Sequence, residues 1–235
     1  VGIIDSTTSA TCTGTLIAPN LVLTARHCVA ALPPMFDCMS AFGAEVSPSV
    51  VYVTTEPNLW MAQPSDFYQA SAIVVEPGPG VLCGDDIALI VLGSNVPAAE
   101  AAPITPRVDV GAMVAETYAA VGYGATSDFG SDGGERRRRD GLVVECLGAA
   151  CGASVGVTEW RGNEGICAGD SGGPALDAQG RVLGVVSRGA FGCTQPVYAD
   201  VLQHADWLRA EGVDAAAVGG YPTPPWALGE PTSMG

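Results

Sequence analysis

The sequence has no lysine and only two histidines, and no apolar run in it approaches the roughly 18 residues that cross a bilayer as a helix. All ten basic residues are arginines, and 25 carboxylates leave a formal net charge of −15. Because phosphate binding needs a basic face, this balance argues against nucleic acid as a partner. The lack of a long apolar run argues against a membrane partner in the same way.

Charged residues are scarce in general, at 15% of the 235 positions, whereas hydrophobic residues make up 48%. A chain of this composition has enough apolar surface to form a core, which excludes an intrinsically disordered protein. Its length fits one large domain or two small ones. The 31 glycines and 17 prolines predict many turns.

Cysteine pairs of the C-x-x-C type are absent, and the eight cysteines are widely and irregularly spaced. An even number of cysteines fits thiols or metal ligands in a reducing cell, or four disulfides in an oxidising compartment. Because the spacing lacks the usual zinc pattern, it favours disulfides. We therefore expect a secreted or periplasmic protein.

Short apolar or alternating segments, separated by Gly, Pro, Asn and Asp, predict an all-β fold of antiparallel strands. The predicted strands are residues 15–17, 21–24, 50–54, 72–76, 87–92, 113–121, 142–146, 181–187 and 196–201. One helix is predicted over 202–211, with Gly212 just past its end. The proline- and glycine-rich tail 213–235 is expected to be loosely held or disordered.

Residues 125–140, which include the arginine run 136–139, are predicted to form a flexible surface loop. The alternative is a docking patch for an acidic partner, because four adjacent cations attract carboxylates. The sequence does not assign a role to this run.

The stretch "CAGDSGGP" at 167–174 reads as a tight turn when taken alone, but its Ser171 is a candidate nucleophile. A serine nucleophile needs an imidazole base and a carboxylate that orients it. His27 follows an apolar strand in "LVLTARHC", whereas His204 lies within the predicted helix and is interpreted as structural. Asp86 opens the apolar strand of "CGDDIALIVLG", where a charge is costly unless it is paired, and Asp85 reads as a turn residue.

The stretches "TARHC", "DIALI" and "GDSGGP", in this order, together resemble the trypsin/chymotrypsin family of serine proteases over residues 1–212. The resemblance implies two six-stranded antiparallel β-barrels, about 1–105 and 106–201, with the active site in the cleft between them and a C-terminal helix. It implies a serine endopeptidase that cleaves peptide or protein substrates through an acyl-enzyme. No cofactor and no metal are implied.

The resemblance also implies a role for each site residue. Ser171 is the nucleophile, His27 the general base and then acid, and Asp86 the group that orients His27. The backbone amides of Gly169 and Ser171 form the oxyanion hole. Two disulfides, Cys12–Cys28 and Cys167–Cys193, follow from the family, and Cys38–Cys83 and Cys146–Cys151 remain by subtraction.

The resemblance assigns substrate binding to five residues: Gly165, Ile166, Ser187, Arg188 and Gly189. The family commonly has an aromatic residue where this chain has Arg188, so the preference of the neighbouring subsite is open. Gly165 stands where trypsin-like enzymes have an aspartate, and Ile166 narrows the pocket. We expect cleavage after a small or medium uncharged residue, although the adjacent Glu164 leaves a basic preference open.

In the family, a newly released N-terminus pairs with the aspartate before the catalytic serine, which is Asp170 here. Val1 lies eleven positions before Cys12, closer than in the family, and "VGIIDS" matches the first barrel strand better. An unpaired buried Asp170 would be costly. Either the activating segment is a separate chain, or it lies upstream of Val1, or Asp170 is neutralised in another way.

Two rival functions remain to be weighed. The motif around Ser171 also fits the nucleophile elbow of α/β-hydrolases, with His204 following it, but the preceding "EWRGNEGICAGD" is polar and glycine-rich rather than a buried strand. The second rival is a catalytically silent or zymogen-like binding module on a protease fold. The presence of His27, Asp86 and Ser171 argues against it.

Overall fold

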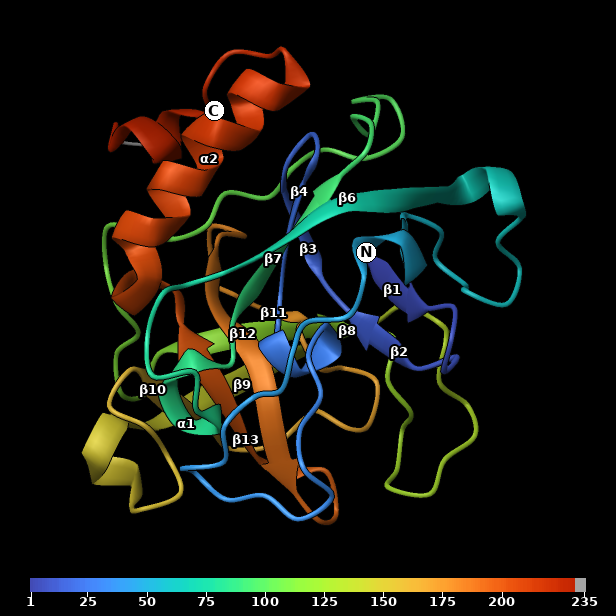
Figure 1. The fold of residues 1–235 in the computed structure, drawn as a ribbon. Coiled ribbons are helices and arrows are strands. Elements are labelled where there is room, and N and C mark those ends of the chain that lie inside the picture. The colour runs from blue at the N-terminus through green and yellow to red at the C-terminus, as the bar shows by residue number, and fades with distance from the viewer. Residues whose placement is uncertain (231–235) are drawn as a thin grey trace.

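The computed structural model describes residues 1–230, and its first half forms one curled antiparallel sheet (Figure 1). The strand order is β2-β1-β5-β6-β7-β4-β3. Its edge strands β2 and β3 are consecutive in the chain and are separated only by Gly14, so the sheet is a nearly closed barrel. The strands are β1 (Gly2–Asp5), β2 (Thr11–Thr13), β3 (Thr15–Ala18), β4 (Leu21–Thr24), β5 (Val51–Thr54), β6 (Phe67–Val75) and β7 (Ala88–Leu92).

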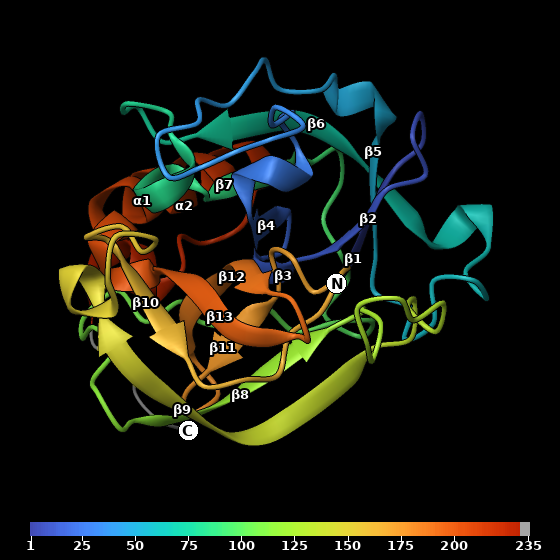
Figure 2. The same ribbon diagram turned by 90° about the horizontal axis from the view of Figure 1, so that it is seen from below.

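The second half forms a closed barrel with the strand order β10-β13-β12-β11-β8-β9, which lies against the first sheet in Figure 2. Its strands are β8 (Thr117–Gly122), β9 (Arg137–Leu147), β10 (Glu159–Gly162), β11 (Pro174–Leu176), β12 (Val182–Ala190) and β13 (Thr194–Asp200). The prediction of an all-β fold with two barrels and a C-terminal helix is therefore confirmed. The first barrel has seven strand segments rather than six because Gly14 interrupts the strand between β2 and β3. A Cβ at Gly14 would lie 2.7 Å from Val22 Cγ1.

One apolar cluster joins the two barrels to the C-terminal helix. It includes Leu21 and Leu89 from the first barrel, Val185 from the second, and Leu208 and Trp226 from the C-terminal region. Each fully buried aliphatic side chain contributes about 1.5–3 kcal/mol relative to exposure. This shared core fixes how the two barrels sit against each other.

The C-terminal helix α2 (Ala205–Gly219) is longer than predicted. A 3-10 turn, Val201–His204, occupies the predicted helix start. Gly212, which the sequence predicts as the helix end, lies inside α2. A Cβ at this position would be 2.5 Å from Trp226 Cη2, so a larger residue would clash there. This glycine makes room for packing and does not end the helix.

The prediction of a loose tail from residue 213 was wrong as far as the structure reaches. Residues 213–219 continue α2, and a further 3-10 turn, Pro225–Leu228, packs on it (Figure 1). Trp226 is 3% exposed, and its Nε1 donates to the Ile17 carbonyl at 3.3 Å. Residues 231–235 lie outside the described residues. Within residues 1–230, no helix has the length and apolar character needed to cross a membrane.

The prediction of a loop over 125–140 was also wrong for residues 137–140, which form part of a strand. β9 begins at Arg137, and Arg137, Arg138 and Arg139 pair with Gly122, Val121 and Ala120 of β8. Barrel closure satisfies the backbone groups of this segment, while the side chains point to acidic neighbours. Arg138 pairs with Asp140 at 2.8 Å and Arg139 with Glu164 at 2.6 Å.

Candidate active site

His27 lies in a 3-10 turn, Arg26–Cys28, immediately after β4. The disulfide between Cys12 and Cys28 ties this turn to β2. The other disulfides in the structure are Cys167–Cys193, the second pair implied by the resemblance, and Cys38–Cys83 and Cys146–Cys151, the two pairs expected by subtraction. The side chain of His27 is 21% exposed, so its imidazole has one face open to solvent.

Asp86 is fully buried and faces the imidazole of His27. A short helical turn, α1 (Leu82–Asp85), leads into it, and β7 begins two residues later. Its carboxylate accepts three hydrogen bonds, from the His27 amide at 2.9 Å, from His27 Nδ1 at 2.8 Å and from Ser187 Oγ at 2.5 Å. A buried carboxylate is tolerated only with such partners.

The ion pair changes the proton affinity of both groups. Burial disfavours the charged form of each, but the charge and the hydrogen bonds of the partner outweigh burial. The pKa of His27 is therefore raised above its ordinary value, and the pKa of Asp86 is lowered. Because Nδ1–H of His27 donates its hydrogen bond to Asp86, the Nε2 of the imidazole remains the nitrogen that can accept a proton.

Ser171 lies in the loop before β11, pressed against the segment that carries His27. Its carbonyl accepts from the Thr13 amide at 2.8 Å and lies 3.6 Å from Cys28 Sγ. At Gly172, with φ +80°, a Cβ would lie 2.0 Å from Thr24 Oγ1. Only glycine fits there, so the sequence "DSGG" lets the serine loop approach the His27 turn closely.

Gly169 has φ +98°, and its position in the loop leaves two amides free. The Ala168 carbonyl accepts from the Ala125 amide at 2.9 Å, so the Gly169 N–H points the opposite way from that carbonyl across a trans peptide. Within residues 1–230, neither the Gly169 nor the Ser171 amide donates to another protein group. Two unpaired donors flanking one residue are suited to bind an anion.

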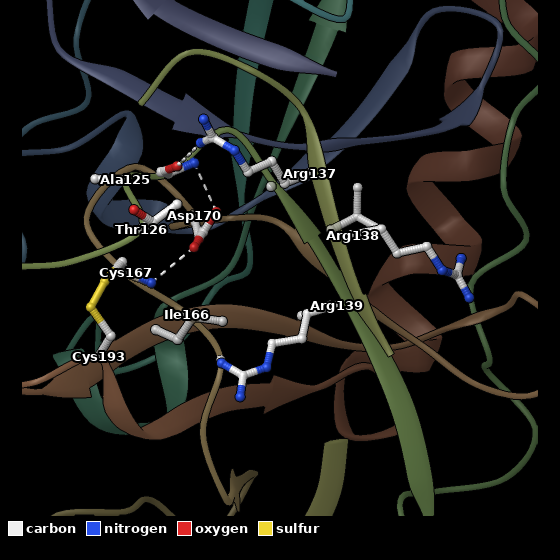
Figure 3. A pocket seen from close by; sticks show the side chains of 14 residues that line it. Ala125, Thr126, Arg137, Arg138, Arg139, Ile166, Cys167, Asp170 and Cys193 are labelled. Carbon is white, nitrogen blue, oxygen red and sulfur yellow. Dashed lines mark hydrogen bonds between the residues drawn. A yellow bond between two sulfur atoms is a disulfide. The ribbon is translucent and has the colours of Figure 1, made fainter. Parts of the chain in front are cut away.

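Asp170 borders a cavity of about 290 Å³ that is also lined by Gly165, Ile166 and Arg137. Its carboxylate accepts from the amides of Gly124 and Cys167, both at 2.8 Å. Figure 3 shows the carboxylate between these amides, with the Arg138 side chain turned away from it. Burial raises the pKa of Asp170, although the two amides and Arg137 oppose the rise.

The amino group of Val1 does not reach this carboxylate, because it donates to the Gly14 carbonyl at 2.9 Å. Asp170 therefore has amide partners but no cation in direct contact among the described residues.

The residues expected to bind substrate lie along β12 and the loop before Ser171. Ser187 is buried and donates to Asp86. Ile166 is 6% exposed, and a Cβ at Gly189 would lie 3.1 Å from its Cδ1, so Ile166 fills the space beside Gly189. The Arg188 side chain pairs with Glu159 of β10 at 2.6 Å.

Sequence reasoning did not find Glu159. The available signal was a carboxylate directly before the buried Trp160, where a charge requires a partner. His204 is buried, as expected of a structural histidine, and its Nδ1 contacts Glu76.

Two groups of side chains within residues 1–230 have the composition of metal sites. They are Cys12, His27 and Cys28, and Asp128, Cys167 and Cys193. The cysteines in both are joined in disulfides. A disulfide sulfur lacks the thiolate that binds metal, so neither group is suited to hold one.

Comparisons with known proteins identify the family. The family model described as Trypsin matches residues 1–208. A trypsin of Saccharopolyspora erythraea is 29% identical over 221 residues, covering 88% of each chain. A trypsin of Simulium vittatum is 28% identical over 202 residues, covering 81% of this chain and 74% of its own. Human kallikrein-9 is 46% identical over 54 residues, 21% of each chain. The protein therefore belongs to the trypsin family of serine proteases.

Proposed function

We propose that the protein is a serine endopeptidase that works through an acyl-enzyme, with His27, Asp86 and Ser171 as its catalytic residues. The observation that carries the proposal is the buried Asp86 bound to His27 Nδ1 at 2.8 Å, beside the loop of Ser171. This pairing leaves Nε2 of His27 as the base that a serine hydroxyl requires.

In the proposed reaction, Ser171 Oγ attacks the peptide carbonyl while its proton passes to His27 Nε2. The negative charge that develops on the carbonyl oxygen is bound by the amides of Gly169 and Ser171. His27 then gives the proton to the departing amine, which breaks the C–N bond and leaves an ester on Ser171. Water, deprotonated by His27, attacks the ester and restores the enzyme.

The substrate backbone binds along Ser187–Gly189 as an added strand, because this edge of β12 is where the family binds peptides. Gly165 and Ile166 are the positions that we expect to decide which substrate residue is accepted before the cut. Gly165 carries no charge to attract lysine or arginine, and Ile166 occupies the space beside Gly189. These features support cleavage after a small or medium uncharged residue.

A peptide series that varies only the residue before the cut tests this preference. We expect the highest kcat/KM for small or medium uncharged residues, and Ile166→Gly should raise kcat/KM for phenylalanine relative to alanine by about tenfold or more. Ile73→Ala, in the first barrel, serves as the control. A wild-type preference for lysine or arginine, or an unchanged ratio in Ile166→Gly, would contradict the assignment.

The cavity beside Asp170 supports a second part of the proposal, an activating cation from a segment upstream of Val1 or from a separate chain. Asp170 is half-buried, and its loop carries Gly169 and Ser171, so a cation bound to its carboxylate would steady the oxyanion hole.

A form extended with the natural upstream residues should therefore show a higher turnover, by about 10²-fold, the typical value of an oxyanion-hole donor. Asp170→Asn in both forms should remove the difference. Equal turnover of the extended form and of residues 1–235 would overturn this part of the proposal while leaving the protease assignment intact.

The compartment is the last part of the proposal. Four disulfides fit an oxidising environment, and we place the protein outside the cytosol, secreted or periplasmic.

A further inference from the structure

The hydrogen bonds around Asp86 continue beyond Ser187. Ser187 Oγ donates to Asp86 Oδ2 at 2.5 Å, and the same oxygen accepts from Arg188 Nη1 at 3.0 Å. A hydroxyl that accepts from a guanidinium becomes a better donor, because the bonds polarise one another. Arg188 therefore acts on the His27–Asp86 pair without touching it.

The guanidinium of Arg188 forms a bidentate ion pair with the buried carboxylate of Glu159. Its Nη1 and Nη2 donate to the two carboxylate oxygens of Glu159, at 2.7 and 2.6 Å, and Nη2 also donates to the Ser154 carbonyl at 2.7 Å. The Glu159 side chain is completely buried, whereas that of Arg188 is 17% exposed. A bidentate arginine pair of this kind fixes orientation as well as charge.

Glu159 also supports the turn that carries Asp86. Its carboxylate accepts from the Gly84 amide at 3.1 Å and from the Gly156 amide at 2.6 Å, and Thr158 Oγ1 donates to the Gly84 carbonyl at 3.1 Å. Gly84 has φ +110° and lies two residues before Asp86. β10 of the second barrel therefore holds the turn of the first barrel from which Asp86 projects.

The remaining charges near His27 are engaged elsewhere. Arg26 pairs with Glu45 at 2.9 Å, and Asp85 accepts from the Val81 amide at 3.0 Å. The Asp170 carboxylate faces the Gly124 and Cys167 amides.

Burial lowers the pKa of His27 and Asp86 raises it, and among the described cations Arg188 is the one whose charge opposes protonation of the imidazole. Glu159 partly cancels that cation.

We propose that Arg188 and Glu159 are positioning residues, which hold Ser187 against Asp86 and set the pH at which His27 loses its proton. The effect on catalysis rests on the proposed protease function, but the effect on His27 does not. The two residues act with opposite signs, because one carries a positive charge and the other neutralises it. A role confined to packing would not give opposite signs.

The test is an NMR titration of protein labelled with ¹³C at histidine Cε1, where only His27 and His204 give signals. His204→Gln assigns the two resonances. Arg188→Gln should raise the midpoint of His27 by about 0.5–1 pH unit, and Glu159→Gln should lower it by a similar amount. The double variant should return close to the wild-type midpoint. Arg161→Gln, which removes a β10 arginine paired with Glu145 at 3.3 Å, is the matched control and should shift neither histidine.

Shifts of equal sign in the two single variants, or no shift in either, would overturn the proposal. If one single variant fails to fold, the double variant and the other single variant still test the proposal. A double variant whose His27 midpoint is shifted as far as that of the remaining single variant would exclude charge as the cause. The acid limb of kcat/KM should move with the NMR midpoint. Opposite NMR shifts in a protein that cleaves no peptide would uphold this inference and refute the protease function.

Discussion

Replacing Ser171 by alanine is expected to lower kcat/KM on peptide substrates by roughly 10⁴- to 10⁶-fold. The proposed reaction begins with the Ser171 hydroxyl, whose oxygen forms the ester of the acyl-enzyme. The loss should appear in kcat, with little change in KM, because the substrate edge Ser187–Gly189 is untouched. Steady-state hydrolysis of a chromogenic ester and of a peptide amide measures both constants.

Ser71→Ala, at an exposed position of β6, is the matched control and should be fully active. The thermal unfolding midpoint of Ser171→Ala should stay near that of the wild type, because the side chain accepts and donates no hydrogen bond within residues 1–230. Residual activity of Ser171→Ala within tenfold of the wild type would remove serine from the mechanism.

Replacing Asp86 by asparagine should lower kcat by about 10⁴-fold at neutral pH. The amide cannot stabilise the imidazolium that forms when His27 takes the serine proton. Its NH₂ can also donate to Nδ1, which moves the imidazole hydrogen to Nε2 and removes the base. Stopped-assay kinetics near pH 7.5 measure the loss, and Asp85→Asn is the adjacent control.

Asp86→Asn should also change how the free energy of unfolding depends on pH. The raised pKa of His27 stabilises the fold fully below its unfolded value of 6.5, and this contribution is lost as pH rises through the folded value. The lowered pKa of Asp86 stabilises the fold above its unfolded value of 3.8 and is lost as pH falls through the folded value. The pair therefore stabilises most between about pH 4 and 6.5, and Asp86→Asn should flatten that window in denaturant unfolding. An unchanged pH dependence would show that the pair is not charged in the fold.

The sequence was most informative where short motifs carry a specific geometric demand. The "DSGG" run requires glycines that admit the serine loop beside Thr24, and Asp86 requires a partner because it opens a buried strand. Every predicted strand overlaps one in the structure. The strands that this pattern did not predict, β1, β2, β10 and β11, have only three or four residues, too few to show a period of two. Of these, β1 was matched only through the family resemblance.

Tertiary packing decided the remaining elements. Gly212 has the appearance of a helix end, yet its missing side chain is required by Trp226, which lies fourteen positions further along the chain. The arginine run reads as a solvated loop, yet its backbone completes a barrel. Glu159 escaped notice for the same reason, since its partners Arg188 and Gly84 are 29 and 75 positions away.

Labelling with a fluorophosphonate probe would show whether Ser171 is a nucleophile activated by His27. Residues 1–235, the form extended upstream and Ser171→Ala of each would be treated with the probe, and the modified peptide identified by mass spectrometry. We expect one label on Ser171, at least in the extended form, and no label in either Ser171→Ala variant. Absence of label in both forms, or a label that persists after Ser171→Ala, would contradict it.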